Sequence, residues 1–193
     1  MSLAGIDQAW KNFLIGMGDA KTVINKTQQE FKQTMEDQID EFKREVAENL
    51  QNFKKQAPFV MTKDFEAENN KKAFDNIAHF QAECKSLRDR EDDMQFGLEI
   101  FNIEALKYMD LAQVEKENAS LLSIWNIKQE WDHEWNRWKI INFADLDFRE
   151  MEELASDILF KVNSLSKDEK KWKVAEVIYD RIFTFLNTLP LIT

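Results

Sequence analysis

Apolar side chains recur at helical spacing over residues 19–56, which is the most regular stretch of the chain. The repeating positions step by three or four residues, and all but one are apolar: Ile24, Gln28, Phe31, Met35, Ile39, Phe42, Val46, Leu50 and Phe53. A repeat sustained for about four heptads predicts a long helix that packs along another helix. We expect Asp19 to cap this helix and Pro58 to end it.

The pattern after Pro58 predicts further helices joined by irregular segments. A second helix is expected to begin near Ala67. The apolar stretch 96–103, which contains Gly97, is interpreted as a buried loop, with Asn102 capping a third helix that would run over residues 104–139. The spacing of apolar positions then continues at helical period toward the C-terminus.

Two capping boxes mark the last two predicted helices. Asp147 precedes Glu150 by three residues, and Ser166 precedes Glu169 by the same spacing. Each pair can satisfy backbone N–H groups at a helix start, so helices are expected from both points, the last ending before Pro190. The fold class is therefore predicted to be all-α, an elongated antiparallel bundle of about five helices.

Tryptophans form a stripe on the third predicted helix. At 100° per residue, Trp131, Trp135 and Trp138 fall within an arc of about 60°. Each ring can bury about 200 Å², so this face is expected to be core. The predicted structural anchors of the chain are Trp125, Trp131, Trp135, Trp138, Trp172, Leu189 and Pro190.

Composition excludes several classes of protein. The 193 residues include only four Gly and two Pro, whereas sheet folds need turn residues at every reversal and phosphate-binding loops are built on glycine. A net charge of −10 disfavours nucleic acid as a partner. The single Cys84 fits a reducing, cytoplasmic compartment. No apolar run approaches the roughly 18–20 residues of a membrane span, so no membrane association is expected.

Three candidate chemical sites are weak on the sequence alone. Residues 15–22 resemble a phosphate-binding loop, but Ile15 and Ala20 stand where that loop needs glycine. Glu130 and His133 have the spacing of a di-iron ligand pair, but the two further ligand sets are missing. Two more residues, His79 and Cys84, diverge by about 140° on one helix. We therefore expect no catalytic residue, metal or cofactor.

Residues 124–192 resemble the dynein heavy chain at the junction where its tail enters the linker. The motifs that carry the resemblance are the tryptophan helix (Trp125, Trp131, Trp135, Trp138), then Phe143 with Leu146-Asp147, and the phrase Leu189-Pro190-Leu191-Ile192. Upstream, residues 80–98 are also similar to axonemal heavy chains. The resemblance covers roughly residues 55–193, and residues 1–54 match more loosely.

This resemblance implies a non-catalytic, mechanical segment that connects the tail to the linker of a microtubule motor in cilia or flagella. Residues 1–57 would be a helical tail segment and residues 58–193 the bundle at the junction. The implied location is the axonemal cytoskeleton. The implied partners are the rest of the heavy chain and dynein light or intermediate chains, and the seam from Phe31 to Phe53 could also mediate self-association.

Two alternatives to a motor segment exist on the residues alone. One is a spectrin-like or coiled-coil scaffold unrelated to motors. The other is a four-helix metalloprotein that uses Glu130 and His133.

Overall fold

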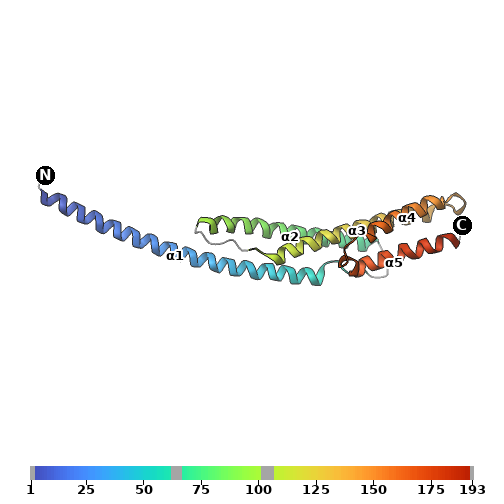
Figure 1. Cartoon of the computed structure of the whole chain (residues 1–193), viewed down its shortest axis with the longest axis horizontal. Helices are drawn as coiled ribbons and strands as arrows, with labels where there is room; N and C mark the ends of the chain where they lie inside the picture. Colours follow the sequence, from blue (N-terminus) through green and yellow to red (C-terminus); the bar gives the residue numbers. More distant parts are fainter. Residues whose placement is uncertain (1–2, 62–66, 101–106, 192–193) are drawn as a thin grey trace. The chain divides into compact units, whose positions relative to one another are not determined.

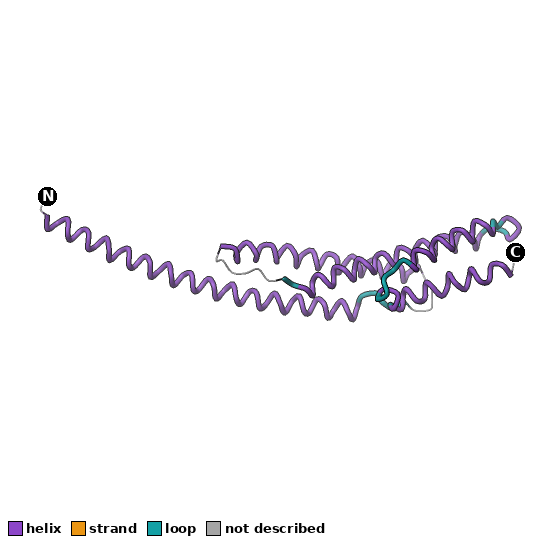
Figure 2. Tube along the Cα trace, in the orientation of Figure 1, coloured by secondary structure: helices purple, strands orange, loops and turns teal. Residues whose placement is uncertain are grey.

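A computed structural model describes residues 3–61, 67–100 and 107–191 of the chain, and their side chains from residue 6 onward except 67–69. Five α-helices account for most of these residues, and no strand occurs among them, as the trace in Figure 2 shows. The helices are α1 (Leu3–Gln56), α2 (Ala67–Ile100), α3 (Met109–Ile140), α4 (Phe148–Asn163) and α5 (Lys173–Thr188), and three short 3₁₀ turns are η1 (Phe143–Asp145), η2 (Glu169–Lys171) and η3 (Leu189–Leu191). The predicted all-α fold is confirmed.

The first helix is longer than the sequence pattern predicted. It begins at Leu3 rather than near Asp19, and it carries Gly16 and Gly18 in its interior. Each internal glycine costs a helix about 1 kcal/mol relative to alanine. A break in the helix would cost more, because backbone hydrogen bonds would be lost and a second helix would have to be nucleated. The segment that resembled a phosphate loop is therefore continuous helix. The predicted end before Pro58 is confirmed, since α1 stops at Gln56.

The second helix also extends beyond its predicted end. Residues 96–100 belong to α2 rather than to a buried loop, and Phe96 and Ile100 are exposed while Leu98 is buried. Gly97 faces Met35 so closely that an added Cβ would lie 2.9 Å from the Met35 Cε atom. Glycine serves close helix packing here rather than a turn. The predicted cap Asn102 lies outside the described residues, and α3 starts at Met109 rather than at residue 104.

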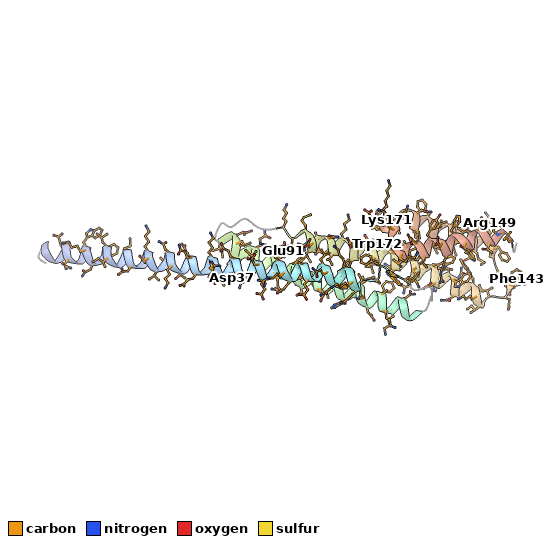
Figure 3. The ribbon with its side chains drawn as sticks, turned by 90° about the horizontal axis from the view of Figure 1, so that it is seen from below. Asp37, Glu91, Phe143, Arg149, Lys171 and Trp172 are labelled. Carbon is orange, nitrogen blue, oxygen red and sulfur yellow. The ribbon has the colours of Figure 1, made fainter. Side chains whose placement is uncertain are left out.

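The chain divides into two compact units, and the division runs through α1 and α2. The first, called here the α1–α2 unit, comprises Met1–Val46 and Arg88–Tyr108. Its core is formed by Met35 and Ile39 of α1 against Leu98 and Met94 of α2. Polar contacts flank this core: Glu45 pairs with Arg90 across the two helices, and Arg88 pairs with Glu91, which is labelled in Figure 3.

Further contacts within the α1–α2 unit cover Phe42 of the first helix. Phe42 is fully buried; Tyr108 packs edge-on against its ring at 4.7 Å, and the Arg90 guanidinium lies 5.4 Å from the ring centre. Burial and the nearby Glu91 carboxylate raise the pKa of Tyr108. Packing stops toward the N-terminus, where every residue from 6 to 34 is exposed.

The second unit, called here the bundle unit, comprises Ala47–Leu87 and Met109–Thr193. Within it, α4 and α5 lie side by side and antiparallel (Figure 1). Both helices also contact α3. The fully buried side chains of this unit come from all five helices: Phe53 of α1, Ile77 and Phe80 of α2, Leu111, Val114, Leu121 and Ile124 of α3, Ala155 and Ile158 of α4, and Ile178 and Ile182 of α5. Within α2 to α5 these positions are three, four or seven residues apart, the spacing of one helix face.

One of the two predicted capping boxes is complete, and it opens a different element than predicted. At the other, Asp147 caps the helix, while the Glu150 side chain accepts from Arg137 at 2.8 Å. Asp147 caps α4, since its side chain accepts hydrogen bonds from the backbone N–H groups of Arg149 and Glu150 at 3.1 Å. The reciprocal pair of Ser166 and Glu169 forms at 3.3 and 2.7 Å. This second box opens η2 rather than α5, which begins only at Lys173.

Candidate functional site

An aromatic cluster joins α3 to α5 in the bundle unit. The ring of Phe185, from α5, lies 5.4 Å from Trp131, 5.8 Å from Trp135 and 5.3 Å from Trp138, all from α3. Trp131 in turn contacts the other two tryptophans at 6.0 and 5.8 Å. Aromatic pairs at such separations contribute about 0.5–1.5 kcal/mol each beyond the area that they bury. The tryptophan stripe of α3 therefore packs around the Phe185 ring of α5, where the two helices are in contact.

The predicted anchors differ in burial. Trp125, Trp131, Trp138 and Leu189 are buried, Trp135 and Trp172 are half-buried, and Pro190 is exposed within η3. A structural anchor must bury its side chain, which the four buried residues do. The anchoring role of each side chain stays a prediction until the effect of its removal is measured.

A groove of about 720 Å³ opens beside the aromatic cluster. Its apolar walls come from Trp131 and Trp135 of α3, Phe185 and Leu189 at the end of α5, and Met61. Three charged side chains of α5, Lys173, Asp180 and Arg181, line it as well. A hydrogen bond from Lys173 to Glu176, at 2.9 Å, raises the pKa of the lysine and keeps it charged. The groove combines an aromatic wall with charged side chains.

The segment that follows α1 is tied to two helices at once. The indole N–H of Trp125, on α3, donates to the carbonyl of Pro58 at 3.0 Å. The backbone N–H of Val174, at the start of α5, donates to the carbonyl of Phe59 at 3.0 Å. The Phe59 ring packs edge-on against Trp172 at 4.9 Å, and Trp172 is labelled in Figure 3. We call residues 58–60 the strap, because they hold α3 and α5 together.

A buried lysine lies on the tryptophan face of α3, and the sequence analysis missed it. The Lys128 side chain is 0 % exposed, and its ammonium donates to Asp132 and to Asn70, at 2.5 Å in each case. Asn70 also donates to Asp132 at 2.6 Å. Burial lowers the pKa of Lys128, and the Asp132 carboxylate partly offsets this effect. A signal existed, since Lys128 lies only about 20° from the edge of the tryptophan arc at 100° per residue.

The weak chemical candidates are occupied with other contacts. Glu130 accepts from Lys161 at 2.6 and 2.7 Å, and His133 is exposed. The imidazole of His79 pairs with Glu83 at 3.4 Å, while Cys84 is buried. Among the described residues, no three His, Cys, Asp or Glu side chains gather as a metal site would need.

Among the described residues, no helix has an apolar stretch that is long enough to cross a membrane.

The bundle unit is thus held together by packed aromatic rings, a strap between two helices and one buried ion pair. These contacts define a helical bundle stabilised by side-chain packing. Residues 111–193 match the family model of the dynein heavy chain, N-terminal region 2. Over nearly its whole length the chain is also similar to axonemal dynein heavy chains. The chain belongs to the dynein heavy chain family.

Individual relatives make the similarity concrete. The chain is 30 % identical over 193 residues to dynein axonemal heavy chain 2 of Mus musculus. It is 31 % identical over 194 residues to the dynein-1-beta heavy chain, flagellar inner arm I1 complex, of Chlamydomonas reinhardtii. Each match covers 99 % of this chain and 4 % of the relative, so the chain spans a small part of their length. This membership excludes a scaffold unrelated to motors.

Proposed function

We propose that this chain is a mechanical, non-catalytic segment of an axonemal dynein heavy chain that joins the tail to the linker of the motor. The axonemal and flagellar names of its relatives support a location in the axoneme of cilia or flagella. The rest of the heavy chain would be its main partner, with dynein light or intermediate chains as further ones. Catalysis of ATP hydrolysis would belong to other parts of the heavy chain.

The observation that carries this proposal is the interlock of α3 with α5. Three tryptophans enclose Phe185, and the strap fixes the same two helices through Trp125 and Val174. Closely packed interiors have low compressibility, so a displacement applied to one helix is passed to the other. A flexible tether would absorb such a displacement instead.

The test compares force transmission with ATP turnover in a heavy chain that carries this segment. Trp131→Ala removes the centre of the aromatic cluster, and Phe160→Ala, which removes an exposed ring of α4, is the matched control. We expect Trp131→Ala to slow microtubule gliding while ATPase activity stays within about twofold of the parent. The control should leave both unchanged.

A second variant guards against a general folding defect. A flexible insertion of about six Gly and Ser residues at η1, between α3 and α4, leaves the aromatic cluster intact but loosens the connection. It should also slow gliding more than ATP turnover. A mechanical role would be contradicted if gliding speed and ATPase activity fell in equal proportion in both variants. It would also be contradicted if neither of them fell.

A further inference from the structure

Three polar or charged side chains are buried in the described part of the chain, and all three donate a hydrogen bond to α2. Asn49 of α1 and Asn118 of α3 are 8 % and 5 % exposed, and Lys128 of α3 is fully buried. The other buried side chains of the described residues are apolar or aromatic. A buried polar group costs free energy unless it is paired, and here the three groups share one helix as the source of their partners.

The two asparagines use only part of their hydrogen-bonding capacity. The Asn49 amide donates to the Glu83 carboxylate at 3.0 Å, and the Asn118 amide donates to the backbone carbonyl of Ile77 at 2.9 Å. The side-chain oxygen of each asparagine is buried without a hydrogen-bond partner in the described chain. An unmet buried acceptor lowers stability, so these two residues are poorly explained as stabilising contacts.

The lysine contacts α2 at a third point. Its ammonium donates to the side-chain oxygen of Asn70 at 2.5 Å, in addition to its pairing with Asp132 on its own helix. Asn70 lies seven residues before Ile77 and thirteen before Glu83. The three contacts are therefore spread along α2, one from α1 and two from α3.

Each of the three residues stands where the helix pattern calls for an apolar side chain. On α1, Asn49 lies three residues after Val46 and four before Phe53, which are both buried, whereas the predicted seam residue Leu50 is half-buried. On α3, six buried residues step by three and four along one heptad seam: Leu111, Val114, Asn118, Leu121, Trp125 and Lys128.

Apolar side chains alone leave the axial position of α2 poorly defined. Its buried positions also repeat by heptads: Ala73, Ile77, Phe80, Cys84 and Leu87. Because the hydrophobic effect is non-directional, a shift of α2 by seven residues, about 10 Å, restores contacts between apolar side chains. The same shift would move the Lys128 ammonium from Asn70 to Ile77 in one direction. In the other direction it would carry the ammonium past Ala67, where α2 begins.

We propose that Asn49, Asn118 and Lys128, called here the register residues, set the axial register of α2 against α1 and α3. A polar residue at a seam position specifies register at a cost in stability. A displaced α2 would leave a buried ammonium against apolar side chains, which is strongly unfavourable. The register residues are positioning residues. Their role is independent of the proposed function, because it concerns the fold of the isolated chain.

Pulsed electron paramagnetic resonance on the 193-residue chain tests the register by a distance. Spin labels are attached at Lys85→Cys of α2 and Gln129→Cys of α3, two exposed positions of the bundle unit, in a Cys84→Ala background. We expect a single distance in this background. A second distance, displaced by about 10 Å, should appear when all three register residues are made apolar. The triple variant combines three substitutions: Asn49→Leu, Asn118→Leu and Lys128→Met.

The matched control carries three comparable substitutions at exposed positions of the same helices: Gln51→Leu, Asn126→Leu and Lys116→Met. It should keep the single distance of the parent background, and circular dichroism should report the same helix content in all three proteins. A single, unchanged distance in a folded triple variant would overturn the proposal. A second distance in the control would overturn it as well, because the effect would then not belong to the buried positions.

Single substitutions test the same role in proteins that keep the other register residues. Asn49→Leu and Asn118→Leu each remove a buried amide whose oxygen has no partner in the described chain. The urea midpoint should therefore rise by roughly 0.3–1 M, while the spin-label distance stays single because Lys128 still requires Asn70. A lower midpoint in either variant would overturn the proposal, since that asparagine would then serve stability rather than register.

Discussion

The enclosed ion pair of Lys128 and Asp132 is the least expected group of residues in the bundle unit. A charged lysine without contact to water is costly, and its carboxylate and amide partners offset that cost. The pKa of Lys128 is lowered, so the folded chain loses this proton at a lower pH than the unfolded chain does. The penalty for the buried charge is complete at neutral pH and disappears as the pH rises toward 10.5, the ordinary lysine value.

Asp132→Asn should therefore destabilise the chain in a pH-dependent way. At pH 7 it leaves a buried ammonium without its counter-charge, and we expect a loss of about 3 kcal/mol in the free energy of unfolding. At pH 10 the loss should be smaller, because Lys128 can shed its proton in the folded variant. Urea unfolding at both pH values measures the difference. An equal loss at both would contradict a charged pair.

The tryptophans of the stripe should also differ in their energetic weight. Trp131 is 3 % exposed and touches three rings, whereas Trp135 is half-buried. Trp131→Ala is expected to cost about 3–5 kcal/mol and Trp135→Ala about half as much, because less surface is lost from the core. Chemical denaturation measures both, with Phe160→Ala as a control near zero. A larger cost at Trp135 would reverse this ranking.

At the scale of single elements, apolar spacing predicted the helices but not where α1 and α3 begin or where α2 ends. The seam from Met35 to Phe53 and the tryptophan face follow directly from residues three and four apart. The first helix was expected to begin at Asp19, just after Gly16 and Gly18, and Gly97 was placed in a loop, yet all three glycines lie inside helices. Glycine lowers helix propensity without forbidding a helix, so neighbouring residues and packing decide the outcome. A single sequence does not reveal that packing.

Two glycines in different environments should respond differently to substitution by alanine, as measured by the stability of their helices. Gly18 has open space around its Cα, so Gly18→Ala should stabilise this part of α1 by about 0.5–1 kcal/mol. Gly97→Ala should gain less, because the new methyl group would displace the Met35 side chain. Hydrogen exchange of nearby amides should slow about two- to fivefold for Gly18→Ala. An equal effect at both positions would mean that Met35 does not resist the methyl group.

At the scale of the whole molecule, the all-α class and the dynein family could be inferred from the sequence, whereas the details of the site could not. The shortage of glycine and proline excluded sheets, and the order of the motifs from Trp125 to Leu189 carried the resemblance. The polar group of Lys128, Asp132 and Asn70 joins residues up to 62 positions apart. The contact of Trp125 with the strap spans more of the chain, since Trp125 and Pro58 are 67 positions apart. Such long-range contacts leave no periodic trace in one sequence.

The distribution of tryptophans makes the chain its own spectroscopic reporter. Five of the six belong to the bundle unit, where three are buried, and only Trp10 lies in the α1–α2 unit, where it is 60 % exposed. Intrinsic fluorescence of the parent chain is therefore dominated by sheltered indoles that emit toward the blue. We expect iodide to quench Trp10 of the N-terminal helix more strongly than the half-buried Trp135 and Trp172, and the three buried indoles least. One optical signal thus separates the two units without any added label.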